Sequence, residues 1–191
     1  MRSTINTERL VIRPWRDDDV TDALAIYGSA AGAHRLSPAM RPITNEVAMQ
    51  EVLHRWQLES EGLSPVGHWG VEHHDSGRVV GGISLAPLPP DGHDLSIAWQ
   101  LAPAAWARGF ATEAVAAVVR WVMERGDAEE LFTILRPRNV RAAATARRIG
   151  MEWAGETEKY YGLRLQTYRI RNSDLADTDR GAMAAEDPLP F

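Results

Sequence analysis

The feature of this sequence that most constrains its fold is a change of hydrophobic period in the middle of the chain. Three consecutive stretches, "HWGVEHH", "RVVGGISLAPL" and "DLSIAWQLAP", read as strands separated by the turn "DSG" and the loop "PLPPDGH". The following stretch, "FATEAVAAVVRWV", instead repeats apolar residues at helical spacing and predicts a helix that stops near Gly126. The buried face of this helix is expected to consist of Ala111, Val115, Val118, Val119 and Val122.

The rest of the chain adds four strands and three helices. A first strand lies in "TERLVIRPW", and two helices follow, one from Val20 to about Gly28 and one capped by Thr44. After the central helix come a strand in "ELFTILRP", a short helix capped by Asn139 that runs to Ile149, and strands in "MEWAGETE" and "LQTYRIR". The predicted order is strand, two helices, three strands, helix, strand, helix and two strands.

Length and charge indicate one domain followed by an acidic tail. The 191 residues include 45% hydrophobic residues, enough for one sizeable core, and we assign residues 1–172 to a single domain. Residues 172–191 hold five acidic residues and one arginine, so they carry −4 of the formal net charge of −5. We expect residues 173–191 to be a disordered tail. The nearly neutral remainder lacks a broad basic surface, so no nucleic acid partner is expected.

Several classes of protein and site are not indicated by the sequence. The absence of cysteine excludes disulfides, thiolate nucleophiles and cysteine-based metal sites. His73 and His74 are adjacent on a predicted strand and point to opposite faces, so no metal site is expected. Gly81-Gly82 lacks dinucleotide-binding spacing and indicates a bulge or a close backbone approach. Without a signal-peptide core or an apolar run of about 18 residues, a cytoplasmic protein with no membrane partner is expected.

One loop has the features of an anion-binding site. Between the strand that ends near Leu101 and the central helix, Gly109 lets backbone approach a ligand closely, and Arg108 adds a charged donor. Free N–H groups at the start of the helix, together with its dipole, favour a phosphate or pyrophosphate. The alternative is that the small residues of this loop only allow the helix to pack on the sheet.

The same loop resembles the acyl-CoA loop of the GNAT N-acetyltransferase superfamily, whose pattern is Gln or Arg, two residues, Gly, one residue, then Gly or Ala. Here the span is Trp106-Ala107-Arg108-Gly109-Phe110-Ala111, with Trp in the first position. The form "WARGFATEA" is similar to that of the branch containing the ribosomal-protein N-terminal (serine/alanine) acetyltransferases. "TERLVIRPW", "GRVVGGISL" and "RPRNVRAAATARRIGM" agree with this branch, so the resemblance covers roughly residues 7–171.

This resemblance implies a fold and a cosubstrate. The fold is a GNAT-like α+β domain, with a mixed, mostly antiparallel, seven-stranded sheet that is flanked by about four helices and splays between strands four and five. The cosubstrate is acetyl-CoA, and no metal is implied. Its pantetheine arm is expected in the splay, along the backbone of Trp99, Gln100 and Leu101. Its pyrophosphate is expected on the amides of Ala107, Arg108, Gly109, Phe110, Ala111 and Thr112.

Four positions near this site bear on residue roles. Asn139 matches a family asparagine that contacts the cofactor, and it is equally suited to cap a helix. A serine often found three residues later appears as Ala142, and a tyrosine often found in the same helix appears as Ala146. The family's usual glutamate on the fourth strand appears as Ser96, which we keep as a candidate catalytic residue.

Other side chains are candidates for proton transfer. Asp94 should share a face with the serine two residues later and is our candidate base, unless it is a solvated turn carboxylate. His93 and His34 are loop candidates for the same role. Tyr160, with its neighbour Tyr161, is a candidate to donate to the leaving thiolate or to line the acceptor site, and the alternative is simple packing.

The implied activity is transfer of acetyl from acetyl-CoA to a primary amine, either a protein N-terminal amine or a small-molecule amine, by direct attack in a ternary complex. Two alternatives stay open: transfer of succinyl or another acyl group on the same fold, and a non-catalytic acyl-CoA-binding domain. The acceptor is expected to be selected by loops at residues 34–42, 63–68 and 160–166, which carry no motif. Family members often form dimers, so a homodimer is compatible with the sequence.

Overall fold

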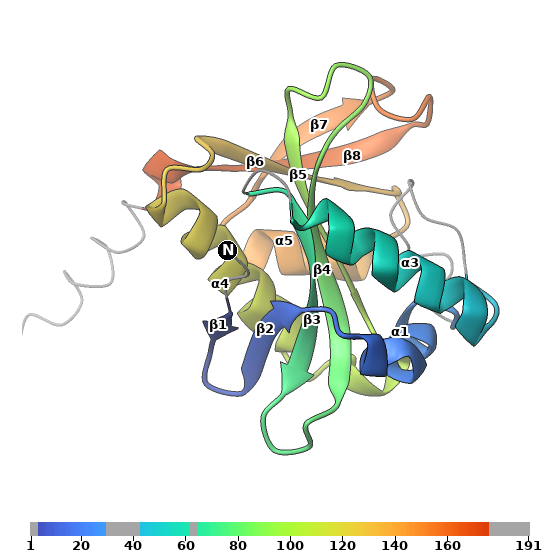
Figure 1. Cartoon of the computed structure of the whole chain (residues 1–191). Helices are drawn as coiled ribbons and strands as arrows, with labels where there is room; N and C mark the ends of the chain where they lie inside the picture. The colour runs from blue at the N-terminus through green and yellow to red at the C-terminus, as the bar shows by residue number, and fades with distance from the viewer. Residues whose placement is uncertain (1–3, 30–42, 62–64, 176–191) are drawn as a thin grey trace, which may run out of the picture.

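The computed structural model describes residues 4–29, 43–61 and 65–175, which form one mixed sheet with helices packed against it (Figure 1). The strand order is β1-β2-β3-β4-β5-β6-β8-β7. The strands are β1 (Ile5–Asn6), β2 (Leu10–Pro14), β3 (Gly67–His73), β4 (Val79–Pro87), β5 (Leu95–Leu101), β6 (Glu130–Leu135), β7 (Glu152–Thr157) and β8 (Leu165–Arg171). The helices are α1 (Val20–Tyr27), α3 (Glu46–Glu59), α4 (Phe110–Glu124) and α5 (Val140–Arg148), with 3₁₀ turns η1 (Asp17–Asp19) and η2 (Pro103–Ala105).

The predicted order of elements is confirmed, with two differences. The seven predicted strands are β2 to β8, and the two-residue β1 adds an eighth, paired antiparallel with β2 through Ile5 and Ile12. Thr44 is not the N-cap of α3. Because α3 begins at Glu46, the cap is Asn45, whose side chain accepts a hydrogen bond from the Ala48 N–H at 2.9 Å. Of the predicted tail, residues 173–175 lie in a short helical turn, and residues 176–191 lie outside the described residues.

The sheet opens between β5 and β6, as predicted for the fourth and fifth strands of the sequence pattern. These two strands run parallel, and within the described chain they are paired only at Ser96 and Phe132. The other neighbouring strands pair antiparallel over two to seven residues. Beyond Ser96, therefore, β5 continues without β6 beside it, and the opening lies next to the loop that leads into α4.

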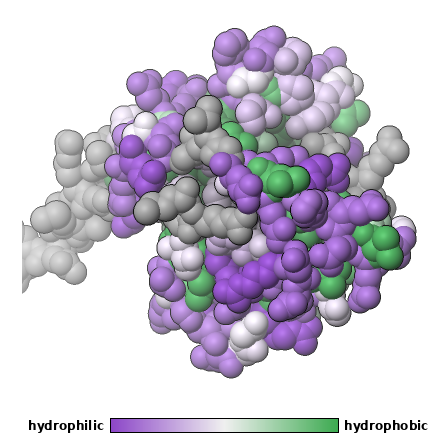
Figure 2. All heavy atoms as spheres, in the orientation of Figure 1, coloured by the Kyte–Doolittle hydropathy of each residue, from purple (hydrophilic) through white to green (hydrophobic). Residues whose placement is uncertain are grey.

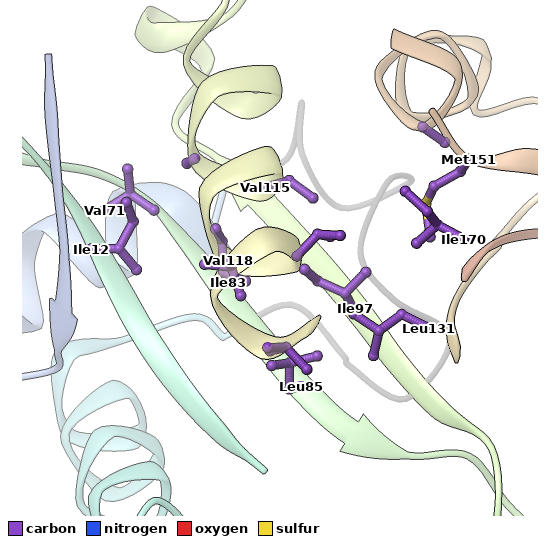
Figure 3. Close-up of a cluster of buried hydrophobic side chains, with 14 of the residues drawn as sticks. Ile12, Val71, Ile83, Leu85, Ile97, Val115, Val118, Leu131, Met151 and Ile170 are labelled. Atoms are coloured by element: carbon purple, nitrogen blue, oxygen red, sulfur yellow. The ribbon is translucent and has the colours of Figure 1, made fainter. Parts of the chain in front are cut away.

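Two apolar clusters hold helices against the sheet. In the larger one, Val115 and Val118 of α4 lie beside Ile83 and Ile97 of the sheet, and Leu131 of β6 continues the cluster beyond the single β5–β6 pair (Figure 3). In the smaller one, α1 and α3 pack through rings whose centroids are 5.1 to 6.2 Å apart; these are Trp15, Tyr27 and Trp56. Burial in these clusters fixes α3 and α4 relative to β5.

The glycine pair of β4 provides close approach, as the sequence indicated. A Cβ on Gly81 would lie 2.3 Å from Cδ2 of Leu101, and a Cβ on Gly82 would lie 2.1 Å from the hydroxyl of Tyr27. The β3–β4 register also shifts opposite this pair, between Val71 and Glu72. The two glycines therefore bring β5 and α1 against β4, next to the opening in the sheet.

A buried ion pair ties β2 to the turn before α1. The Arg13 guanidinium donates to both oxygens of Asp19, at 2.7 and 2.9 Å, and its Nε donates to Glu72 at 2.6 Å. Hydrogen bonding to Asp19 raises the pKa of Arg13 against the opposing effect of burial. Arg13 is 4% exposed and Asp19 is 7% exposed, so neither charge has water as a substitute partner.

The surface on the α3 side is mainly hydrophilic, and its hydrophobic residues form separate patches (Figure 2). Large exposed apolar side chains on the described chain include Val47, Leu58, Val140 and Trp153. Val47 and Leu58 lie near opposite ends of α3, Val140 lies on α5 and Trp153 lies on β7.

Candidate active site

The opening in the sheet leaves backbone groups of β5 available to a ligand. The N–H of Ala102 donates to the carbonyl of Val80 at 3.0 Å, so antiparallel alternation turns the even-numbered residues of β5 toward β4. The N–H and C=O groups of Trp99 and Leu101 therefore point toward the opening. Among the described residues, the Leu101 carbonyl accepts the indole N–H of Trp106 at 3.0 Å. Trp99 is opposite Ile83 at a position of the β4–β5 register that exchanges no hydrogen bonds, and no described residue of β6 is paired with it.

Gln100 contributes to this site differently from the sequence expectation. It is opposite Gly82 in the β4–β5 register, and its backbone belongs to that pair rather than to the opening. Its side chain is 7% exposed and lies at the wall of two cavities described below. Trp99 and Leu101 can therefore make the backbone contacts that were predicted along this strand, whereas Gln100 offers only its side chain to a ligand.

The loop before α4 is shaped by left-handed backbone at two positions, Ala107 with φ 62° and Gly109 with φ 82°. The hydrogen-bond ladder of α4 begins where the Glu113 N–H donates to the Gly109 carbonyl at 3.1 Å. The N–H groups of residues 110–112 thus precede the ladder and are open to an acceptor. With the positive end of the helix dipole, they form a place for phosphate oxygens.

An interaction with the β1–β2 turn fixes this loop. Arg9 donates from Nε to Glu113 at 2.7 Å and from Nη1 to the Arg108 carbonyl at 3.1 Å, and Thr7 donates to Glu113 at 2.6 Å. The guanidinium groups of Arg9 and Arg108 lie 4.9 and 4.6 Å from the centre of the Phe110 ring. Burial opposes ionisation, yet the hydrogen bonds from Thr7 and Arg9 hold the pKa of Glu113 below its usual range.

A cavity of about 110 Å³, which we call the loop pocket, lies where β5, the loop and α5 meet. Its lining residues are Trp99, Gln100, Leu101, Trp106, Ala107, Ala111, Asn139, Arg141, Ala142 and Thr145. Six of the ten predicted cofactor residues are therefore brought together. The other four, Arg108, Gly109, Phe110 and Thr112, lie beside the pocket on the loop and first turn of α4. Trp106, Arg141 and Thr145 were not predicted to form its wall.

Asn139 combines the two roles that the sequence left open. Its Oδ1 accepts the Ala142 N–H at 3.3 Å, which caps α5, and its side chain also lines the loop pocket. Ala142 presents a methyl group there instead of a hydroxyl. Ala146 is fully buried in the main core, so its side chain does not reach the pocket.

A larger cavity of about 780 Å³, which we call the α3 pocket, lies between α3 and the face of the sheet that α3 covers. It shares Trp99 and Gln100 with the loop pocket. Its polar and aromatic lining residues are Tyr27, Thr44, Glu51, Arg55, Trp56, Glu59, His68, Ser84, Ser96 and Tyr161. Two ligands, one in each pocket, would therefore meet at Trp99 and Gln100 of β5.

The predicted catalytic residues separate into two groups. Ser96 lines the α3 pocket, as does Tyr161. Asp94 and Tyr160 line neither pocket. Instead, the Tyr160 hydroxyl and Lys159 Nζ both donate to Oδ2 of Asp94, at 2.8 and 2.5 Å. Hydrogen bonds from Lys159 and Tyr160 hold the pKa of Asp94 below its usual range, which makes it a weaker base. Its role as a base stays a prediction.

The remaining histidines that were singled out do not converge on a site. His73 Nδ1 lies 3.3 Å from the Ser76 hydroxyl, and His74 Nε2 lies 3.3 Å from the Thr7 carbonyl. His93 lines neither pocket, and His34 lies outside the described residues. In residues 4–29, 43–61 and 65–175, no three His, Asp or Glu side chains gather as metal ligands, and no helix is long and apolar enough to cross a membrane.

Comparison with known proteins agrees with this geometry. A curated relative, the uncharacterized N-acetyltransferase YoaA of Bacillus subtilis, is 24% identical over 118 residues, and the match spans 61% of this chain and 64% of that protein. The solved structure of the ribosomal-protein-S5-alanine acetyltransferase of Vibrio fischeri has a TM-score of 0.73 and 14% identity, covering 90% of this chain and 98% of that one. The ribosomal L7/L12 α-N-protein acetyltransferase RimL, solved with coenzyme A, has a TM-score of 0.73 and 17% identity, covering 88% of this chain and 98% of that one.

At these identities the structural likeness shows a shared fold. The sequence match is more direct, because the family of the acetyltransferase (GNAT) domain matches residues 9–152, about three quarters of the chain. That segment contains the opening in the sheet, the loop before α4 and the walls of the loop pocket. The chain therefore belongs to the GNAT acetyltransferase family.

Proposed function

We propose that this chain transfers acetyl from acetyl-CoA to a primary amine by direct attack within a ternary complex. The observation that carries the proposal is the shared wall of Trp99 and Gln100 between the loop pocket and the α3 pocket. A thioester approaching from one side and an amine from the other would meet there. Holding two reactants in contact is itself a large part of the acceleration of such a reaction.

The chain offers specific groups to each part of the donor. The N–H and C=O of Trp99, which face the opening, suit the amides of a pantetheine arm, and the N–H groups of residues 107–112 suit a pyrophosphate. An N–H directed into the opening is also positioned to donate to an oxyanion that forms at the thioester carbon. That RimL has been solved with coenzyme A supports this assignment of the donor side.

We propose a protein N-terminal amine as the acceptor, with a small-molecule amine as the alternative. The names of two structural neighbours, an S5-alanine acetyltransferase and an L7/L12 α-N-protein acetyltransferase, support this choice. A cavity of about 780 Å³ also has room for the first residues of a peptide. The cytoplasmic location and the homodimer expected from the sequence stay predictions, which cell fractionation and light scattering test.

The proposal is tested by following thiol release from acetyl-CoA. The acceptors are peptides with a free N-terminal Ala or Ser, small primary amines, and a buffer control, while calorimetry measures coenzyme A binding in parallel. Amine-dependent thiol release supports the proposal. Coenzyme A binding without release by any amine would support a binding domain instead, and faster release from succinyl-CoA than from acetyl-CoA would change the acyl group.

A further inference from the structure

The α3 pocket contains a histidine–carboxylate pair that no sequence motif indicated. His68 is the second residue of β3, and its ring is stacked on that of Trp56 at a centroid distance of 4.9 Å and an interplanar angle of 9°. Its Nε2 lies 2.9 Å from an oxygen of Glu59, and its side chain is 14% exposed. The ring is therefore held in one orientation by stacking from α3 on one side and a hydrogen bond from α3 on its edge.

The sheet register connects this histidine to the opening. His68 is opposite Ser84, and Ser84 is opposite Ala98, so the three residues form a row on one face of the sheet. The two neighbours of His68 in this row, Ser84 and Ala98, are small, and the whole row lines the α3 pocket. Adjacent strands are about 4.8 Å apart, which places the His68 backbone about 10 Å from Ala98. Ala98 directly precedes Trp99, whose backbone faces the opening.

The pair has the chemistry of a proton acceptor. When Nε2–H donates to Glu59, the other ring nitrogen, Nδ1, carries a lone pair, and no described residue occupies it. Burial lowers the pKa of His68 below its ordinary value and Arg55 lowers it further, against the opposing effect of Glu59, which favours the neutral ring that can accept a proton. The other ionisable groups that line the same pocket are Tyr27, Glu51 and Tyr161.

We propose that His68, oriented by Glu59, is the general base that takes the proton from the acceptor ammonium. This role rests on the proposed function, and it supplies the base that is missing at Ser96. Nδ1 accepts one proton from R–NH3+, directly or through one water, and leaves R–NH2. The amine nitrogen then forms the C–N bond to the thioester carbon, the C–S bond breaks, and the departing sulfur takes the second proton from the nitrogen.

The test compares His68→Gln with His54→Gln, a matched change at an exposed histidine of α3 outside both pockets. The acceptor is a peptide with a free N-terminal alanine, and rates are measured with acetyl-CoA from pH 6 to 9.5. We expect H68Q to lower kcat at pH 7 by about 100-fold or more, the usual effect of a general base. The deficit should shrink above pH 8, where the peptide amine loses its proton unaided. The KM for acetyl-CoA should not change, and H54Q should resemble the wild type.

Glu59→Gln separates a positioning role from simple packing. It keeps an oxygen near Nε2 but removes the charge that raises the pKa of His68, so the acidic limb of the pH–rate profile should move to lower pH. An unmoved profile would refute the pairing. Equal kcat for H68Q and wild type at pH 7, or a pH-independent loss, overturns the role of His68.

Two other outcomes would show whether the role of His68 or the proposed function itself is wrong. A loss confined to Asp94→Asn would give the base to Asp94 instead. A wild type that binds coenzyme A but acetylates no amine would refute the proposed function, and this role with it. Unchanged coenzyme A affinity in H68Q shows that the variant retains its fold and its donor site.

Discussion

Replacing Gly109 with valine tests the structure of the cofactor loop. Gly109 precedes α4 with φ at 82°, in the left-handed region that side chains avoid. The first atom of a new side chain would meet only Nη2 of Arg9, at 3.3 Å, so collision with the core is not the main effect. The cost is therefore backbone strain, about 1–2 kcal/mol for an L-residue.

That strain translates into a measurable loss of affinity. If valine shifts the loop away from the conformation that presents the N–H groups of residues 110–112, a cost of about 1–2 kcal/mol weakens coenzyme A binding about 5- to 30-fold. We expect Gly109→Val to raise the Kd for coenzyme A by at least this factor in isothermal titration calorimetry. Valine is β-branched, which places the expected effect at the upper end of the range.

Gly126→Val is the matched control. Gly126 follows the other end of α4 with φ 68°, and an added Cβ there would meet no atom within 4 Å. The same strain should lower Tm by about 2–8 °C in both variants, because each kcal/mol is worth about 2–4 °C in a chain of this size. Only Gly109→Val should lose coenzyme A affinity. Wild-type affinity in that variant, or an equal loss in the control, would refute the loop assignment.

Three further predictions concern the stability of the fold. Gly82→Ala should lower the free energy of unfolding by about 1–3 kcal/mol in urea, because its Cβ would lie 2.1 Å from the Tyr27 hydroxyl, and adding Tyr27→Phe should restore part of the loss. Asp19→Ala should cost about 3–5 kcal/mol, since it removes the bidentate partner of buried Arg13, and a loss below about 0.5 kcal/mol would contradict this. The lowered pKa of folded His68 means that the unfolded chain binds more protons, so Tm should fall as pH drops below about 6.5, and less steeply in His68→Gln.

Elements whose signals are local could be predicted from the sequence. Alternation over five to nine residues identified strands β2 to β8, and the cap at Asn139 depends on a residue three positions away. The two-residue β1 was missed because so short a strand has no period, and its pairing depends on β2. Thr44 and Asn45 are both good capping residues, so the position of the first helical residue had to decide between them.

In the candidate site, too, local features could be predicted and contacts between distant residues could not. The loop before α4 is contiguous in sequence and could be found, whereas the Arg9–Glu113 contact that fixes it joins residues 104 positions apart. Asp94 carries the right functional group, but it lies outside both pockets, and its hydrogen-bond partners Lys159 and Tyr160 are 65 and 66 positions away in the sequence. The pairing of His68 with α3 likewise depends on how the helix packs on the sheet, which no spacing reveals.

The most direct test of the account is a crystal structure of the chain with coenzyme A. It should show the pantetheine arm in the opening between β5 and β6, bonded to the N–H and C=O of Trp99, with pyrophosphate oxygens on the N–H groups of residues 107–112. Coenzyme A bound elsewhere, with that opening empty, would contradict the assignment of the donor site and the meeting point of the two pockets.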